Sequence, residues 1–293
     1  MSSLHVVVVG GTGLVGSEVV RELLRRGVSP SVITRSEEKG RSLPEGTTPL
    51  VGDLLDPDFV RSAFVRADAV FLLNAVSATE THEALMAVNG IRAGGAGRVV
   101  YLSVQDPERA PHLPHYGSKL GVEAALQASG LPTTILRPNN FFQNDLWLRE
   151  ALVSYGVYSQ PIGSVGISRV DVRDIAEAAA IALVESGREG TYDLVGPDVL
   201  TGPDVADVWS GALGRPVRYG GDDVRAWEQE NRAYMPPWMA YDFALMYRYF
   251  QDRGLTATTD ALRRLTALLG RPPRTFAAFA NEVAAEWASS DSP

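Results

Sequence analysis

The stretch HYGSK, residues 115–119, holds three side chains that can give, take or polarise a proton: His115, Tyr116 and Lys119. Pro114 is typical of the first turn of a helix, so we expect a helix to begin here. Residues three and four positions before Lys119 lie on one helix face, about 100° apart around the axis. Tyr116 and His115 could therefore each reach a group beside Lys119, but from different directions.

The positive end of that helix and the Lys119 ammonium act on both neighbours. Positive charge favours a tyrosinate, which makes Tyr116 a better acid, and it disfavours an imidazolium at His115. A neutral histidine can still donate one N–H hydrogen bond to a carbonyl group. Packing of Tyr116 in the core and exposure of His115 in the first turn are the structural alternatives. The proton donor therefore stays open between Tyr116, His115 and neither.

A glycine-rich loop near the N-terminus carries the most specific motif. In VVVVGGTGLVGSEVV, residues 6–20, both GxxGxxG and GxGxxG follow a β-branched run and open an amphipathic helix. This context is typical of a dinucleotide-binding turn, whose glycines allow the tight turn, the approach of a pyrophosphate and close helix–strand packing. Backbone amides of the first helical turn then face the anion. The predicted cofactor-binding residues here are Gly10, Gly11, Thr12, Gly13, Leu14, Val15 and Gly16.

The end of the second strand predicts the choice of dinucleotide. NAD-binding sheets usually place an acid there for the ribose hydroxyl, whereas this chain has Thr34, Arg35 and Ser36. A guanidinium suits a 2′-phosphate, so we expect NADP(H) rather than NAD(H), with Arg35 and Ser36 as contacts. The contacts predicted after the third and fourth strands are Asp53 and Leu54 at the adenine, and Asn74 and Ala75 near the middle of the cofactor.

Short β-branched runs alternate with longer segments of helical period along the first half of the chain. This rhythm predicts an α/β fold, a doubly wound parallel sheet of the Rossmann type with right-handed crossovers. The predicted strands are 5–9, 31–34, 48–51, 69–73, 98–103, 133–137 and 191–195. The predicted helices are 14–26, 57–65, 79–92, 114–129, 141–153 and 169–186.

The regular alternation of strands and helices ends after about residue 155, and mostly helical segments follow. We expect a dinucleotide-binding Rossmann domain over 1–155 and a smaller, mostly helical substrate-binding lobe over 156–293, with its one strand returning to the main sheet. Segment 222–252 carries most of the aromatic and methionine residues and a Pro236-Pro237 break. It fits the core of the lobe, the lid of an apolar pocket, or both on opposite helix faces.

Composition narrows the class of protein. The 293 residues are 45% hydrophobic and 21% charged, which suits a globular protein with a sizeable core. The net charge is −8 with no basic block, so a nucleic-acid partner is not expected. There is no cysteine, no signal-peptide pattern and no apolar run long enough for a membrane span. We expect a cytoplasmic monomer or homodimer that acts on a small molecule, without a metal.

Several segments in order resemble a known family. GGTGLVG, TRS, GDLLDP, VVYLS, SKLGVEAALQASGLPTTILRPNNFFQN, VDVRDIAEAAA and GRPPRTFAAFANE resemble the atypical short-chain dehydrogenase/reductase proteins of the NmrA-like type, along nearly the whole chain. The resemblance implies a Rossmann domain that binds NADP(H) and a lobe that closes over the substrate. The family includes quinone reductases, and also redox sensors that bind the dinucleotide without turning it over.

The resemblance also implies roles for particular residues. The strand-end serine of the superfamily falls on Ser103, and the active-site lysine falls on Lys119, which in such sites holds the nicotinamide ribose. The segment RPNNFFQN then places Pro138, Asn139, Asn140 and Phe141 beside the nicotinamide. The chain departs from the superfamily motif YxxxK, because His115 stands four residues before Lys119 and Tyr116 only three.

Two functions fit these residues. The first is an NADPH-dependent reductase that transfers hydride to a small, apolar quinone-, enone- or ketone-like substrate. A tyrosine out of register suits quinones and enones better than simple ketones, because their reduced anion is delocalised and can take its proton from water. The alternative is a non-catalytic NADP(H)-binding redox sensor or regulatory protein.

Overall fold

The computed structural model describes residues 4–290, which form two compact units. The first unit holds the chain up to residue 138 together with 172–193. The second unit holds 139–171 and the chain from 194 onward. The chain therefore passes between the units three times, whereas the sequence predicted one boundary at residue 155.

A seven-stranded sheet forms the centre of the first unit, in the order β3-β2-β1-β4-β5-β6-β8. The strand pairs from β3 to β6 are parallel, with Val8 opposite Val32 on one side and Phe71 on the other. This confirms the predicted doubly wound sheet, including the return of a late strand beside β6. The strands are β1 (Val6–Val9), β2 (Ser31–Thr34), β3 (Thr48–Val51), β4 (Ala69–Leu72), β5 (Val99–Leu102), β6 (Thr133–Pro138) and β8 (Gly190–Leu194).

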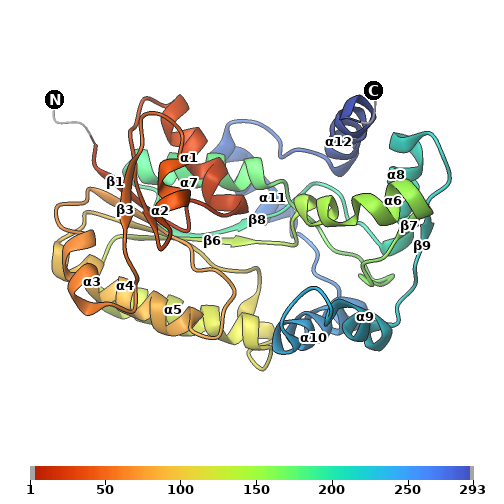
Figure 1. The fold of residues 1–293 in the computed structure, drawn as a ribbon, viewed down its shortest axis with the longest axis horizontal. Coiled ribbons are helices and arrows are strands. Elements are labelled where there is room, and N and C mark those ends of the chain that lie inside the picture. Colours follow the sequence, from red (N-terminus) through yellow and green to blue (C-terminus); the bar gives the residue numbers. More distant parts are fainter. Residues whose placement is uncertain (1–3, 291–293) are drawn as a thin grey trace. The chain divides into compact units, whose positions relative to one another are not determined.

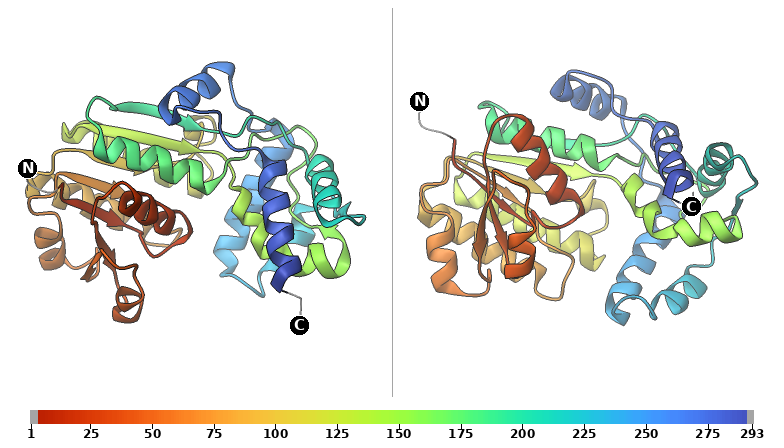
Figure 2. Two further views of the ribbon diagram at one scale, coloured as in Figure 1. Left: turned by 90° about the horizontal axis from the view of Figure 1, so that it is seen from above. Right: turned by 45° about the horizontal axis from the view of Figure 1, so that its top comes forward.

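The central strands are apolar throughout because helices cover both faces of the sheet. All four residues of β1, β4 and β5 are buried. Helices α1 and α7 lie side by side on one face, and α3, α4 and α5 cover the other (Figures 1 and 2). The helical segments of this unit are α1 (Leu14–Arg25), α2 (Glu37–Arg41), α3 (Pro57–Ala63), α4 (Glu80–Gly94), η1 (Pro107–Arg109), α5 (Pro114–Ser129) and α7 (Val172–Val184).

Helix α7 explains why the predicted domain boundary differs from the division in the structure. The sequence assigned this helix to the second lobe because it follows residue 155. Its alanine-rich run packs against α1 and against β4, β5 and β6, and nearly all its side chains are buried. Small side chains let a helix approach a neighbouring helix and a sheet closely, so this segment completes the Rossmann layer.

The second unit packs its helices around an aromatic core that includes Phe142, Trp209, Phe250 and Phe276. A small two-stranded parallel sheet, β7 (Val157–Tyr158) with β9 (Arg218–Tyr219), was not predicted because its strands have two residues each. The helical segments are η2 (Phe142–Leu148), α6 (Arg149–Tyr155), α8 (Gly202–Leu213), α9 (Val224–Asn231), α10 (Pro237–Arg253), α11 (Thr259–Leu269) and α12 (Phe276–Ser290).

The aromatic segment 222–252 divides its side chains between core and surface. Tyr247 and Phe250 are buried, whereas Tyr234 is 86% exposed and Tyr241 53% exposed. The predicted Pro236-Pro237 break falls between α9 and α10, and Pro237 is the first residue of α10. The interpretation as core packing is confirmed for one face of α10, where Tyr247 and Phe250 are buried. The interpretation as the lid of an apolar pocket stays a prediction.

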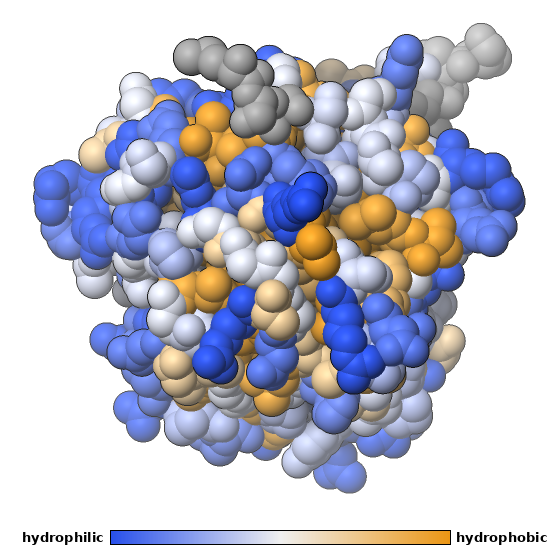
Figure 3. Space-filling model, turned by 90° about the vertical axis from the view of Figure 1, so that its left-hand side faces the viewer, coloured by the Kyte–Doolittle hydropathy of each residue, from blue (hydrophilic) through white to orange (hydrophobic). Residues whose placement is uncertain are grey.

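No helix within residues 4–290 has both the length and the apolar character to cross a bilayer. On the face drawn in Figure 3, hydrophilic residues are interspersed with apolar ones.

Candidate functional site

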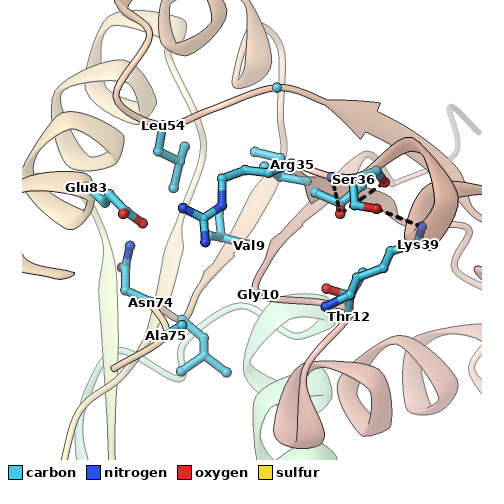
Figure 4. Close-up of a pocket in the computed structure, with 14 residues that line it drawn as sticks. Val9, Gly10, Thr12, Arg35, Ser36, Lys39, Leu54, Asn74, Ala75 and Glu83 are labelled. Atoms are coloured by element: carbon cyan, nitrogen blue, oxygen red, sulfur yellow. Dashed lines mark hydrogen bonds between the residues drawn. The ribbon is translucent and has the colours of Figure 1, made fainter. Parts of the chain in front are cut away.

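A cavity of about 340 Å³ opens in the first unit where β1, β2, β3 and β4 end. Ligands of open α/β sheets bind at the carboxyl ends of the strands, where the strand order reverses, and here that point lies between β1 and β4. The lining residues are Val9, Gly10, Thr12, Ile33, Thr34, Arg35, Ser36, Lys39, Gly52, Leu54, Leu73, Asn74, Ala75 and Glu83 (Figure 4).

Two glycines of the predicted phosphate loop are required by the backbone itself. Gly10 has φ +77°, and a Cβ there would lie 2.5 Å from the carbonyl oxygen of Leu73. A Cβ on Gly16 would lie 2.1 Å from the carbonyl oxygen of Gly10. The amide of Gly13 donates to the same oxygen at 3.0 Å, which closes the turn. The loop therefore brings the start of α1 against the end of β1.

The N-terminus of α1 is arranged to receive an anion. Gly13 occupies the N-cap without a side-chain cap, and no acidic residue stands in the first turn. The unpaired amides and the helix dipole both favour negative charge at this end. Of the seven predicted loop residues, Gly10 and Thr12 line the cavity. Leu14 is 44% exposed, and Val15, in the first turn of α1, is buried.

Two cations line the cavity beyond β2. Arg35 and Lys39 are both exposed, and neither side chain forms an ion pair among residues 4–290. Ser36 caps α2, accepting a hydrogen bond from the Lys39 amide at 3.2 Å. This cap turns the chain so that Lys39 points back toward Thr12, while Arg35 reaches across the cavity (Figure 4). Lys39 was not predicted, although its position four residues after Arg35 could have indicated a second cation at the same site.

The two residues predicted at the adenine behave differently. Leu54 is 6% exposed and lines the cavity. The Asp53 carboxylate accepts a hydrogen bond from the Leu55 amide at 2.9 Å, which forms a local turn, and Asp53 is not among the lining residues. A contact of Asp53 with a nucleotide therefore stays a prediction, and the structure gives its carboxylate a local role.

Asn74 lines the cavity with a buried side-chain amide that points to a polar ligand. Its side chain is 4% exposed, and neither its amide nitrogen nor its amide oxygen has a hydrogen-bond partner among the residues that the structure describes. Leaving such a buried group unsatisfied costs about 1–3 kcal/mol. Ala75 lines the cavity beside it. An unsatisfied amide that faces a cavity fits a bound polar ligand, and a dinucleotide supplies both donors and acceptors.

The structure places the three residues of HYGSK in very different surroundings. Helix α5 begins at Pro114, as predicted, and Tyr116 is completely buried in it. Lys119 is 3% exposed, and its ammonium lies 2.5 Å from the carboxylate of Glu80, which is 5% exposed. This buried ion pair joins α5 to the start of α4. The sequence did not indicate Glu80.

His115 is half-buried, and its ring centroid lies 6.2 Å from that of Tyr116. Burial first, and then the positive charge of Lys119, lower the pKa of His115 from 6.5 to about 3. The prediction that His115 stays neutral agrees with this direction. The main cause is loss of solvent rather than the helix dipole, and a neutral imidazole is a poor proton donor near neutral pH.

His115 makes the stability of the protein depend on pH. The unfolded chain takes up a proton as the pH falls below about 6.5, whereas the folded chain does so only near pH 3, so stability drops through this window. We expect a loss of about 1–2 kcal/mol between pH 6.5 and pH 5, measured by urea unfolding. His115→Gln should abolish this loss of stability between pH 6.5 and pH 5, and substitution of the exposed His112 by glutamine should leave it in place. If stability still fell by the same amount in His115→Gln, His115 would not be its source.

Ser103 belongs to a second buried network. Its hydroxyl donates to the carboxylate of Glu123. Arg137 donates to the same carboxylate at 2.7 and 3.1 Å and also contacts Glu108 at 3.1 Å. Tyr101, between the two networks, has its pKa raised by burial and by the Glu80 and Glu123 charges. The serine at the superfamily position thus already donates its hydrogen bond to an acceptor within the protein.

The predicted nicotinamide segment belongs mostly to the second unit. Pro138 ends β6, and Asn139 donates to the Leu255 carbonyl at 2.6 Å. Asn140 accepts a hydrogen bond from Arg169 at 3.0 Å, and the Phe141 carbonyl accepts another at 2.7 Å. These contacts hold the chain around Arg169. A role of Pro138, Asn139, Asn140 and Phe141 beside the nicotinamide stays a prediction.

Arg169 forms a further buried charge pair, which the sequence did not indicate. Its guanidinium lies 2.7 Å from the carboxylate of Asp145, and both side chains are 0% exposed. The indole of Trp209 also donates to this carboxylate at 2.9 Å. Because every partner lies within the second unit, we assign the pair to its packing.

The sheet order, the glycine turn and the cavity define a dinucleotide-binding Rossmann protein. The chain belongs to the NmrA-like family, which matches residues 2–279. A sequence relative, the NAD(P)H azoreductase of Xenophilus azovorans, is 32% identical over 285 residues, covering 96% of this chain and 98% of its own.

Solved structures show the same fold. The NADPH-dependent quinone oxidoreductase of Escherichia coli, complexed with NADPH, aligns with a TM-score of 0.85 at 24% identity, covering 95% of this chain and 99% of its own. The triphenylmethane reductase of Citrobacter sp., complexed with NADP(H), aligns with a TM-score of 0.83 at 23% identity, with 95% and 99% covered. The predicted family, fold and class of NAD(P)H-dependent oxidoreductase are confirmed by these matches.

Proposed function

We propose that this protein is an NADPH-dependent reductase of small, extended conjugated acceptors such as quinones and enones. One observation carries the choice of acceptor, and it concerns the two superfamily positions. The Ser103 hydroxyl donates a hydrogen bond to the buried carboxylate of Glu123, and the Lys119 ammonium forms an ion pair with the buried carboxylate of Glu80. His115 is held neutral, and Tyr116 is completely buried. These residues are arranged for packing rather than for donating a proton to a substrate.

The chemistry of the acceptor follows from this arrangement. NADPH supplies the hydride, and in a simple ketone the resulting alkoxide needs a well-placed acid. A quinone or an enone spreads the negative charge over its conjugated system, so water can protonate it later. A site whose usual acids are engaged elsewhere therefore favours conjugated acceptors.

The cavity supports NADP(H) as the cofactor. The loop from Gly10 to Gly16 and the open start of α1 suit the pyrophosphate. The unsatisfied amide of Asn74 suits a polar part of the nucleotide. Arg35 and Lys39 give two unpaired cations for a 2′-phosphate, where an NAD-specific protein would present an acid.

The relatives support the same class of acceptor. Their names describe reductases of azo compounds, quinones and triphenylmethane dyes, which are all extended conjugated systems. Transfer of this class to the present chain is part of the proposal, because function depends on the site and not on the fold.

A panel of acceptors tests the proposal. We expect NADPH oxidation with quinones and enones, and Tyr116→Phe and Ser103→Ala should each retain that rate within about threefold, because removing a true general acid costs about 10²–10⁴-fold. Loss of the quinone rate in either variant, with folding intact, would contradict the argument. Tight NADPH binding without turnover of any acceptor would favour the sensor instead.

A further inference from the structure

One acidic side chain on the cavity wall has no role in the function proposed above. Glu83 lies in the first turns of α4, is 9% exposed and lines the cavity. One carboxylate oxygen accepts a hydrogen bond from the Thr79 hydroxyl at 2.6 Å, and Glu83 forms no ion pair among residues 4–290. Figure 4 shows Glu83, Asn74 and Leu54 together at one end of the cavity, with the Arg35 guanidinium reaching toward them.

We propose that Glu83 recognises the adenine of the cofactor by accepting a hydrogen bond from the exocyclic amino group of that base. The proposal rests on the NADP(H)-binding function and assigns one residue within it. A carboxylate only accepts hydrogen bonds, so it selects a base that presents a donor. Leu54 provides an apolar surface for the ring, and the planar Arg35 guanidinium can stack on it.

Asn74 completes this end of the cavity. It is more than nine-tenths buried, and neither of its amide atoms has a hydrogen-bond partner within residues 4–290. An amide donates and accepts, so it can pair with a ring nitrogen of adenine while Glu83 takes the amino group. The two side chains thus offer the acceptor and the donor that the edge of adenine requires.

The more obvious candidate from the sequence is Asp53. One oxygen of its carboxylate accepts a hydrogen bond from the Leu55 amide, and Asp53 does not line the cavity. Each of the two acids keeps one carboxylate oxygen without a hydrogen-bond partner in the described chain, so what favours Glu83 is that it lines the cavity and Asp53 does not.

The hypoxanthine analogue of NADPH tests the assignment, because it replaces the amino group by a carbonyl oxygen. We expect the wild type to bind NADPH at least about tenfold more tightly than the analogue in calorimetry. In Glu83→Gln the new amide can donate to that carbonyl, so the analogue should gain affinity and the ratio should fall to about one. Glu38→Gln, an exposed acid outside the cavity lining, should retain the wild-type ratio.

Three results would overturn the assignment. They are an unchanged ratio in Glu83→Gln, an equal loss of affinity for both nucleotides in that variant, and a loss of discrimination in Asp53→Asn instead. Failure of the wild type to bind NADPH at all is a separate result, which would overturn the proposed function itself.

Discussion

Replacing Lys119 by methionine is expected to lower the free energy of unfolding by about 3–5 kcal/mol. The change leaves the Glu80 carboxylate buried without the ammonium that now lies 2.5 Å away. Removing one partner of a buried ion pair is among the most destabilising changes that a single substitution can make. Urea unfolding followed by circular dichroism measures the loss.

Two variants separate the ion pair from a general effect of substitution. The double variant Lys119→Met with Glu80→Gln should recover most of the stability, because no unpaired charge stays buried. Arg61→Ala breaks an exposed pair with Asp58 and should cost at most about 1 kcal/mol. If Lys119→Met instead kept full stability and lost only NADPH affinity, Lys119 would be a cofactor ligand and the ion pair would be incidental.

Removing Arg35 and Lys39 together is expected to weaken NADPH binding about hundredfold, while NADH affinity changes by no more than about twofold. Each cation would contribute a charge-assisted contact to the 2′-phosphate, which is worth about tenfold in affinity at an exposed site. The two single alanine variants should each show about half of the free-energy change. Calorimetric titration with both dinucleotides measures the effect, which should weaken as salt is added.

Arg41, which lies in helix α2 with Lys39, provides the control for this experiment. It pairs with Glu37 at 3.7 Å and does not line the cavity, so Arg41→Ala should leave the NADPH/NADH preference unchanged. An equal loss of NADPH and NADH affinity in the double variant would show that Arg35 and Lys39 do not distinguish the phosphate.

The sheet could be predicted because its signals are local. Four consecutive valines in β1 and the β-branched runs of β2 and β5 reflect burial on both faces, and all seven predicted strands lie within one residue of the observed ends. The turn from Gly10 to Gly16 could be predicted from its local motif, since Gly13 and Gly16 approach the backbone of Gly10 within the same turn. The close approach of Gly10 to Leu73 after β4 could not be predicted locally.

The partners of the site residues could not be predicted, because they come from distant segments. Lys119 meets Glu80 from another helix, and Ser103 meets Glu123 from the helix below its strand. An acid on an amphipathic helix usually faces solvent, so nothing local marked Glu80 or Glu83. Their burial depends on how α4 and α5 pack together.

Comparing the reduction rates of a conjugated and a saturated acceptor tests whether this protein prefers acceptors that need no proton donor during hydride transfer. NADPH consumption by the purified protein would be followed with a naphthoquinone and with a saturated bicyclic ketone of the same size. Because the usual acids are engaged internally, we expect the quinone to be reduced at least about hundredfold faster than the ketone. Equal rates, or a faster ketone, would contradict the account, and so would the absence of any NADPH consumption.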